Sequence, residues 1–72
     1  MVIKFNVFGK QMSVHRIEQH WQLFNDSDTG MSARVYDVVI PSELTPDELA
    51  GYLDDIFHEY ANEKFPEVVK LT

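Results

Sequence analysis

The chain has 72 residues, of which 44% are hydrophobic, and it carries a formal net charge of -6 at pH 7. This length allows a single domain over residues 1–72, and the composition is too apolar for a disordered chain. The sequence contains no cysteine, which excludes a disulfide framework and a thiolate metal site. Because domains of this size have small cores, we expect self-association to supplement the core.

The first residues lack the long apolar run of a signal peptide, and no stretch approaches the roughly 20 apolar residues that cross a bilayer. We therefore expect a cytoplasmic protein with no membrane partner. The charge is uneven along the chain. Residues 1–40 hold four basic and four acidic side chains, whereas residues 41–72 hold two basic and eight acidic ones. This distribution favours basic partners and disfavours nucleic-acid binding through a basic surface.

The N-terminal segment alternates apolar and polar residues, the pattern of a half-buried strand. Gly9 and Lys10 then predict a two-residue turn of type II′, because glycine comes first. This turn would place Phe5 opposite Val14 in an antiparallel hairpin. The predicted register puts four apolar side chains on one face: Phe5, Val7, Met12 and Val14.

A third strand is predicted over residues 20–25, with Trp21 and Leu23 on one face and Phe24 on the other. Six turn-prone residues over 25–30 predict a loop. A fourth strand is predicted over residues 32–40, ended by Pro41. Its alternation is imperfect, so either both of its faces are covered or a bulge shifts the phase.

The start of a helix is marked by Thr45 as the capping residue, Pro46 at the first helical position and Glu48 three residues after the cap. The apolar residues that follow recur at helical spacing, so the helix is amphipathic. It is predicted to end near Glu63 or Lys64, ahead of a proline. Residues 68–71 predict a last short strand.

Together these elements predict an α+β fold: a four- to five-stranded, mostly antiparallel sheet with one long amphipathic helix packed on one face. One helix covers one face of the sheet and leaves the other open. The residues predicted to form an interface on that open face are Phe8, Ile17, Phe24 and Tyr36. Scattered surface apolar residues, which are normal in soluble proteins, are the alternative interpretation.

The chemical motifs are weak. Asp28-Thr29-Gly30 matches the tripeptide of aspartic proteases, and the acidic loop around it vaguely resembles a calcium loop, but both patterns fit an ordinary polar turn better. The histidines have no metal-ligand spacing. We therefore predict no catalytic, cofactor-binding or metal-binding residue and no cofactor. A small enzyme that uses Asp26, Asp28 and a nearby histidine is the weakest hypothesis.

The predicted solvent face of the helix carries an acidic cluster: Asp54, Asp55, His58 and Glu59. Such a surface usually serves solubility. The alternative is a surface that docks a basic partner or imitates a phosphate backbone.

Taken whole, the segments 5–9, 23–30, 34–41 and 52–56 resemble a family of short bacterial proteins of unknown function. The chain is less similar to small sheet-plus-helix antitoxin domains, which share a hairpin start and an acidic helix. The resemblance implies no chemistry. The leading hypothesis is a non-enzymatic protein-interaction module, either a homodimer or a binder of another protein, that acts through the open sheet face. The alternative is an antitoxin-like or DNA-mimicking regulator that binds a basic partner through its acidic helix.

Overall fold

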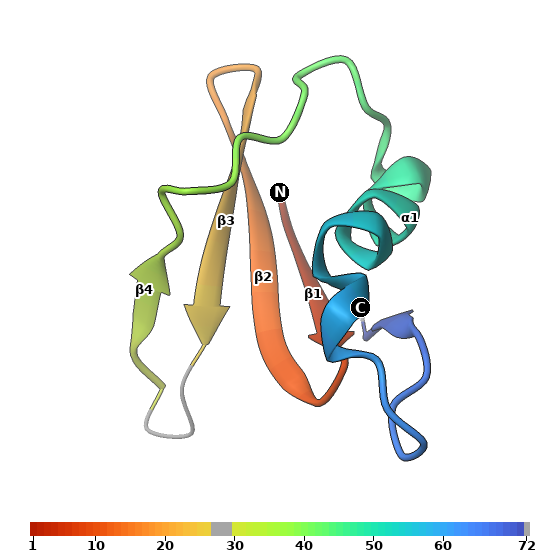
Figure 1. The fold of residues 1–72 in the computed structure, drawn as a ribbon. Coiled ribbons are helices and arrows are strands. Elements are labelled where there is room, and N and C mark those ends of the chain that lie inside the picture. Colours follow the sequence, from red (N-terminus) through yellow and green to blue (C-terminus); the bar gives the residue numbers. More distant parts are fainter. Residues whose placement is uncertain (27–29, 72) are drawn as a thin grey trace.

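The computed structural model describes residues 1–26 and 30–71. Its sheet contains five strands: β1 (Val2–Val7), β2 (Lys10–Ile17), β3 (His20–Asp26), β4 (Ser32–Arg34) and β5 (Val68–Lys70). Their order across the sheet is β4-β3-β2-β1-β5, and neighbouring strands are antiparallel. The helix α1 (Pro46–Phe57) continues into one 3-10 turn, η1 (His58–Tyr60), and packs against β1 and β5 on one face (Figure 1). The predicted α+β class is confirmed.

The β1–β2 hairpin turns one residue earlier than predicted. Val7 pairs with Lys10, so Phe8 and Gly9 are the turn residues. Their φ angles are 51° and 93°, the pattern of a type I′ turn and not of the predicted type II′ turn. The side-chain oxygen of Asn6 accepts the N–H of Gly9 at 2.8 Å and supports this conformation.

The predicted register is therefore wrong by two residues: Phe5 lies opposite Met12, not opposite Val14. Side chains alternate between the two faces of a strand, so a shift of two residues leaves every side chain on its predicted face. The core between the sheet and α1 consequently forms from the predicted residues. Its least exposed apolar side chains are Phe5, Val14, Leu23, Leu49 and Leu53.

The prediction of a strand over residues 32–40 is wrong beyond Arg34, where β4 ends. The chain then leaves the sheet and passes across the ends of β3 and β2 on its way to α1 (Figure 1). Ile40 is buried in the core, and the Tyr52 hydroxyl donates to the carbonyl of Val39 at 2.9 Å. Ile40 therefore packs in the core with Val35 and Val38 partly buried against it, and this packing replaces continued strand pairing.

The predicted helix start is confirmed. Thr45 is the N-cap and Pro46 is the first helical residue. The side chain of Glu48 reaches back, and its Oε1 accepts the backbone N–H of Thr45 at 2.8 Å and the Thr45 hydroxyl at 3.1 Å. These two bonds hold the pKa of Glu48 below its usual value, with the backbone bond the larger cause. The indole N–H of Trp21 donates to the carbonyl of Leu44 at 2.9 Å and ties the helix entrance to β3.

The predicted long helix is wrong: α1 ends at Phe57 after 12 residues and is followed only by η1. The last turn of α1 contains no basic residue, so nothing there compensates the negative end of the helix dipole. The side-chain oxygen of Asn62 then accepts the N–H groups of Lys64 and Phe65 at 3.1 and 2.9 Å. In a longer helix these two N–H groups would bond to helix carbonyls, so their bonds to Asn62 favour a turn at this point.

Candidate functional site

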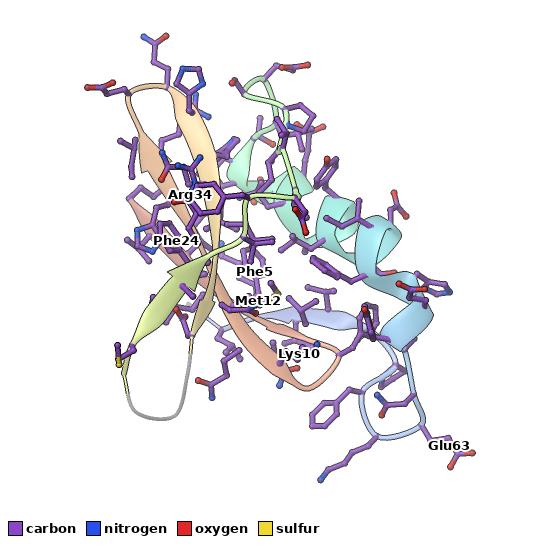
Figure 2. All side chains as sticks on the ribbon, turned by 60° about the vertical axis from the view of Figure 1, so that its left-hand side comes forward. Phe5, Lys10, Met12, Phe24, Arg34 and Glu63 are labelled. Atoms are coloured by element: carbon purple, nitrogen blue, oxygen red, sulfur yellow. The ribbon has the colours of Figure 1, made fainter. Side chains whose placement is uncertain are left out.

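The face of the sheet that points away from α1, which we call the open face, is the candidate site. Figure 2 shows the division: Phe5 and Met12 lie between sheet and helix, whereas Phe24 and Arg34 lie on the other side. The strand registers assign further side chains of both kinds, polar and apolar, to the open face: Val2, Lys4, Ser13, His15, Ile17, Asp26, Ser32, Val69 and Leu71.

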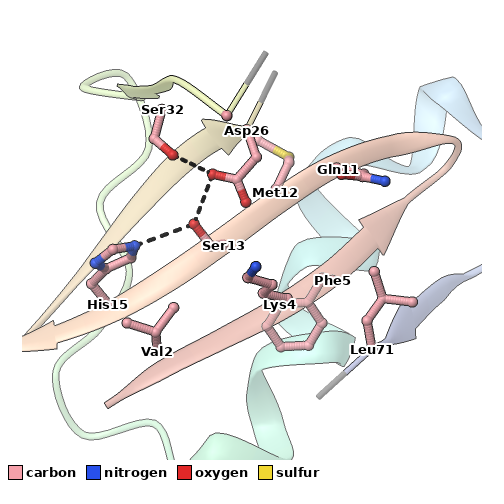
Figure 3. A pocket seen from close by; sticks show the side chains of 11 residues that line it. Val2, Lys4, Phe5, Gln11, Met12, Ser13, His15, Asp26, Ser32 and Leu71 are labelled. Atoms are coloured by element: carbon pink, nitrogen blue, oxygen red, sulfur yellow. Dashed lines mark hydrogen bonds between the residues drawn. The ribbon is translucent and has the colours of Figure 1, made fainter. Parts of the chain in front are cut away.

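Four polar side chains form a continuous hydrogen-bonded chain across β2, β3 and β4 (Figure 3). Ser13 lies at its centre with only 2% of its surface exposed. Its hydroxyl donates to Asp26 Oδ1 at 3.1 Å and lies 3.2 Å from His15 Nε2. Ser32 donates to the same Asp26 oxygen at 2.6 Å. A serine hydroxyl has one proton, so Nε2 of His15 must carry the proton shared with Ser13.

Asp26 and the chain around it border two hollows. The first, of about 540 Å³, is lined by all four members of the chain and by Lys4, with Val2 and Leu71 at its apolar side (Figure 3). The second, of about 700 Å³, shares Asp26 and Ser32 with the first. The carboxylate thus lies at the lip between two depressions and is only partly buried.

The arrangement brings together Asp26 and a histidine, as the enzyme hypothesis required, but in an order unsuited to nucleophilic catalysis. A nucleophilic serine gives its proton to a histidine that a carboxylate orients. Here Ser13 lies between His15 and Asp26 and donates directly to the carboxylate. Its burial also keeps the hydroxyl from a substrate. Asp28, the other member of that hypothesis, and most of the Asp28-Thr29-Gly30 motif lie outside the described residues. The geometry is that of a carboxylate held by two serine hydroxyl groups between two hollows.

Asp26 and Arg34, two charged groups of the open face, do not pair with each other. Within residues 1–26 and 30–71, the Asp26 carboxylate makes no ion pair, and its Oδ2 accepts no hydrogen bond from another described residue. The guanidinium of Arg34, on the neighbouring strand, lies 4.8 Å from the centre of the Tyr36 ring instead. A carboxylate and a guanidinium are therefore both displayed on one face.

The residues predicted to form the interface have different environments. Phe8 must be removed from that set: it is 5% exposed and belongs to the core, because the hairpin turn directs it toward the helix side. Ile17 is 42% exposed and Tyr36 is 74% exposed. Phe24 is half-buried, and its ring lies 4.3 Å from that of His15.

Sequence reasoning missed Ser13, His15 and Ser32 as site residues. The signal was present: Ser13 and His15 alternate with the apolar Met12 and Val14, which places them on the open face. The contact of Ser13 with Asp26 depends on the pairing of β2 with β3, which no local sequence pattern indicates.

The acidic cluster of residues 54–59 lies on the helix side of the molecule, remote from the open face. His58 Nδ1 lies 3.3 Å from Asp54 Oδ1, and 73% of the histidine side chain is exposed. Asp55 and Glu59 are exposed. In the described part of the chain, no lysine or arginine forms an ion pair with these three carboxylates.

Residues 1–26 and 30–71 contain no group of three or more histidine, aspartate or glutamate side chains placed to hold a metal ion. None of their helices has the length and apolar character required to cross a membrane.

Comparisons with known proteins assign a family but no activity. No curated protein and no solved structure matches the chain significantly. One family, described as a domain of unknown function (DUF7661), matches residues 2–72. Because this match spans nearly the whole sequence, the chain belongs to the DUF7661 family.

Proposed function

We propose that this protein is a non-enzymatic protein-interaction module that self-associates through the open face of its sheet. The observation that supports this proposal is that one surface carries both exposed aliphatic side chains and charges of both signs. Four aliphatic side chains there are each close to half exposed: Val2, Ile17, Val69 and Leu71. Charges of both signs lie on the same face: Lys4 is on β1 among the aliphatic residues, and Asp26 and Arg34 are on β3 and β4 toward the other edge.

A second copy is the occupant that these features favour. Exposed aliphatic residues lose contact with water when two such faces meet, which stabilises association by about 25 cal/mol per Å² of apolar surface. Opposite charges on a single face can also pair with their counterparts across a two-fold axis. A small domain with one helix over one side of its sheet gains a second covered side by this contact.

The test is the molar mass by light scattering on a size-exclusion column, over a range of protein concentrations and at two salt levels. We expect a dimer that dissociates on dilution. Ile17→Asp places a charge among the apolar residues of the open face and should give a folded monomer. Ile56→Asp is the matched control, since Ile56 is 38% exposed but lies on α1. A wild-type monomer at every concentration contradicts the proposal.

The acidic helix supports a second candidate function, the binding of a basic partner. Its supporting observation is that Asp54, Asp55 and Glu59 have no lysine or arginine counter-charge in the described residues. Binding of a fluorescent oligolysine peptide should weaken with salt and with the triple change Asp54→Asn, Asp55→Asn, Glu59→Gln. Equal binding by wild type and triple variant would remove this candidate.

A further inference from the structure

We propose that two copies of the chain are joined by two reciprocal ion pairs, each between Asp26 of one copy and the partner's Arg34. This inference rests on the proposed self-association and names the contacts that determine how the copies pair. It begins from a carboxylate that is fixed but incompletely satisfied. Asp26 Oδ1 accepts two hydroxyl groups, from Ser13 and Ser32, while Oδ2 has no partner among the described residues.

The fixed position of Asp26 matters for the energy of the pair. The Ser13 hydroxyl is almost fully buried, so it holds the carboxylate in one orientation before a partner arrives. Less side-chain freedom is then lost on association. Covering Asp26 without a cation would bury an uncompensated charge, which is strongly unfavourable. A partner that covers this face therefore stabilises the contact by supplying a positive group at Oδ2, in addition to Lys4, which lines the same hollow.

Arg34 is the cation that a second copy supplies. It lies on the same face and is exposed, and its guanidinium lies over the Tyr36 ring and makes no ion pair within the described residues. The register pairs Asp26 with Ser32, so Arg34 lies two residues along β4 from the position opposite Asp26. Arg34 therefore lies beside Asp26 without pairing with it.

Two-fold symmetry converts this offset into two contacts. In an interface of that symmetry, if residue i of one copy contacts residue j of the other, then j of the first also contacts i of the second. A carboxylate and a guanidinium that do not pair with each other within one copy thus produce two identical pairs. The guanidinium suits the hollow beside Asp26 because it is planar, permanently charged and less strongly hydrated than an ammonium.

The aliphatic residues of the open face complete the arrangement. Val2 and Leu71 line the same hollow as Asp26, and Ile17 and Val69 lie farther out on the face. When they meet their counterparts they exclude water from the charged pairs, which strengthens the pairs in the lowered dielectric.

The experiment measures the dimer dissociation constant of charge-reversed chains. Arg34→Glu alone and Asp26→Lys alone should each weaken the dimer by about tenfold or more, since each places like charges together. An equimolar mixture of these two variants should form a heterodimer, because one Asp26–Arg34 pair is then native and the other pair is restored with exchanged signs. Lys64→Glu is the control for net charge, since Lys64 is exposed and lies outside the open face.

Circular dichroism and a thermal melt establish that each variant is folded. If Asp26→Lys does not fold, a cycle of Asp26→Asn, Arg34→Gln and the double variant replaces it, and the two single losses should be less than additive in the double variant. A wild-type dimer that Arg34→Glu leaves intact, or fully additive losses, overturns the ion pairs but not the self-association. A monomeric wild type overturns both.

Discussion

The hydroxyl of Ser13 donates to Asp26 Oδ1 at 3.1 Å and joins the centre of β2 to the end of β3. Both residues belong to the open face, yet Ser13 is as inaccessible as the apolar core. The bond therefore has two effects. It stabilises the strand pairing, and it holds the carboxylate that the proposed interface uses.

We expect Ser13→Ala to lower the free energy of unfolding by about 1 kcal/mol, since a buried hydrogen bond contributes roughly 0.5–1.5 kcal/mol. Urea unfolding measures this loss. Ser32→Ala serves as the comparison, because Ser32 donates to the same oxygen but is exposed, and its loss should be smaller. Equal losses would show that burial of Ser13 does not strengthen its bond.

Phe8→Ala should destabilise the protein severely, by about 3–5 kcal/mol, the usual range for truncation of a core phenylalanine. The reason is the burial of Phe8 in the core, where its ring also lies 6.3 Å from that of His58. Thermal denaturation measures the effect. A variant that melts like the wild type would return Phe8 to the surface role that the sequence predicted.

Two glycines should respond to alanine in opposite directions. Gly9 has φ of +93°, and a Cβ there would lie 2.9 Å from the Phe65 ring, so Gly9→Ala should destabilise the protein by about 1–3 kcal/mol. Gly51 lies in α1 with open space around it, so Gly51→Ala should stabilise by about 0.5–1 kcal/mol. Urea denaturation of both variants measures the two changes, and a gain from Gly9→Ala would contradict the turn geometry.

The charge of Glu48 should make stability depend on pH in the acid range. Its pKa in the folded protein lies below the ordinary 4.5, because the ionised carboxylate accepts the Thr45 N–H. The stabilising contribution is therefore complete above pH 4.5 and is lost as the pH falls through the lower, folded value. Glu48→Gln keeps an acceptor without the charge. We expect wild type to exceed this variant in melting temperature at pH 7 and to match it near pH 3, whereas a constant difference would exclude a charge effect.

The sequence predicted the elements whose signals are local. The capping residues around Thr45, the alternation in the first hairpin and the short last strand act over a few neighbouring residues, and the structure confirms them. The hairpin register was wrong by two residues because Asn6 supports a turn at Phe8 and Gly9. The faces were nevertheless right, since strand periodicity does not depend on that shift.

Only the tertiary structure decided the features that depend on distant partners. Residues 35–40 have the composition of a strand, but β4 ends at Arg34 and Ile40 is buried in the core beyond it. The contact between Ser13 and Asp26 likewise joins residues 13 positions apart and exists only when β2 and β3 pair in one register. Local preferences of a few residues determine where helices and turns begin. Competition for burial among distant segments determines where strands end and which polar groups meet, and that competition is resolved only when the chain packs.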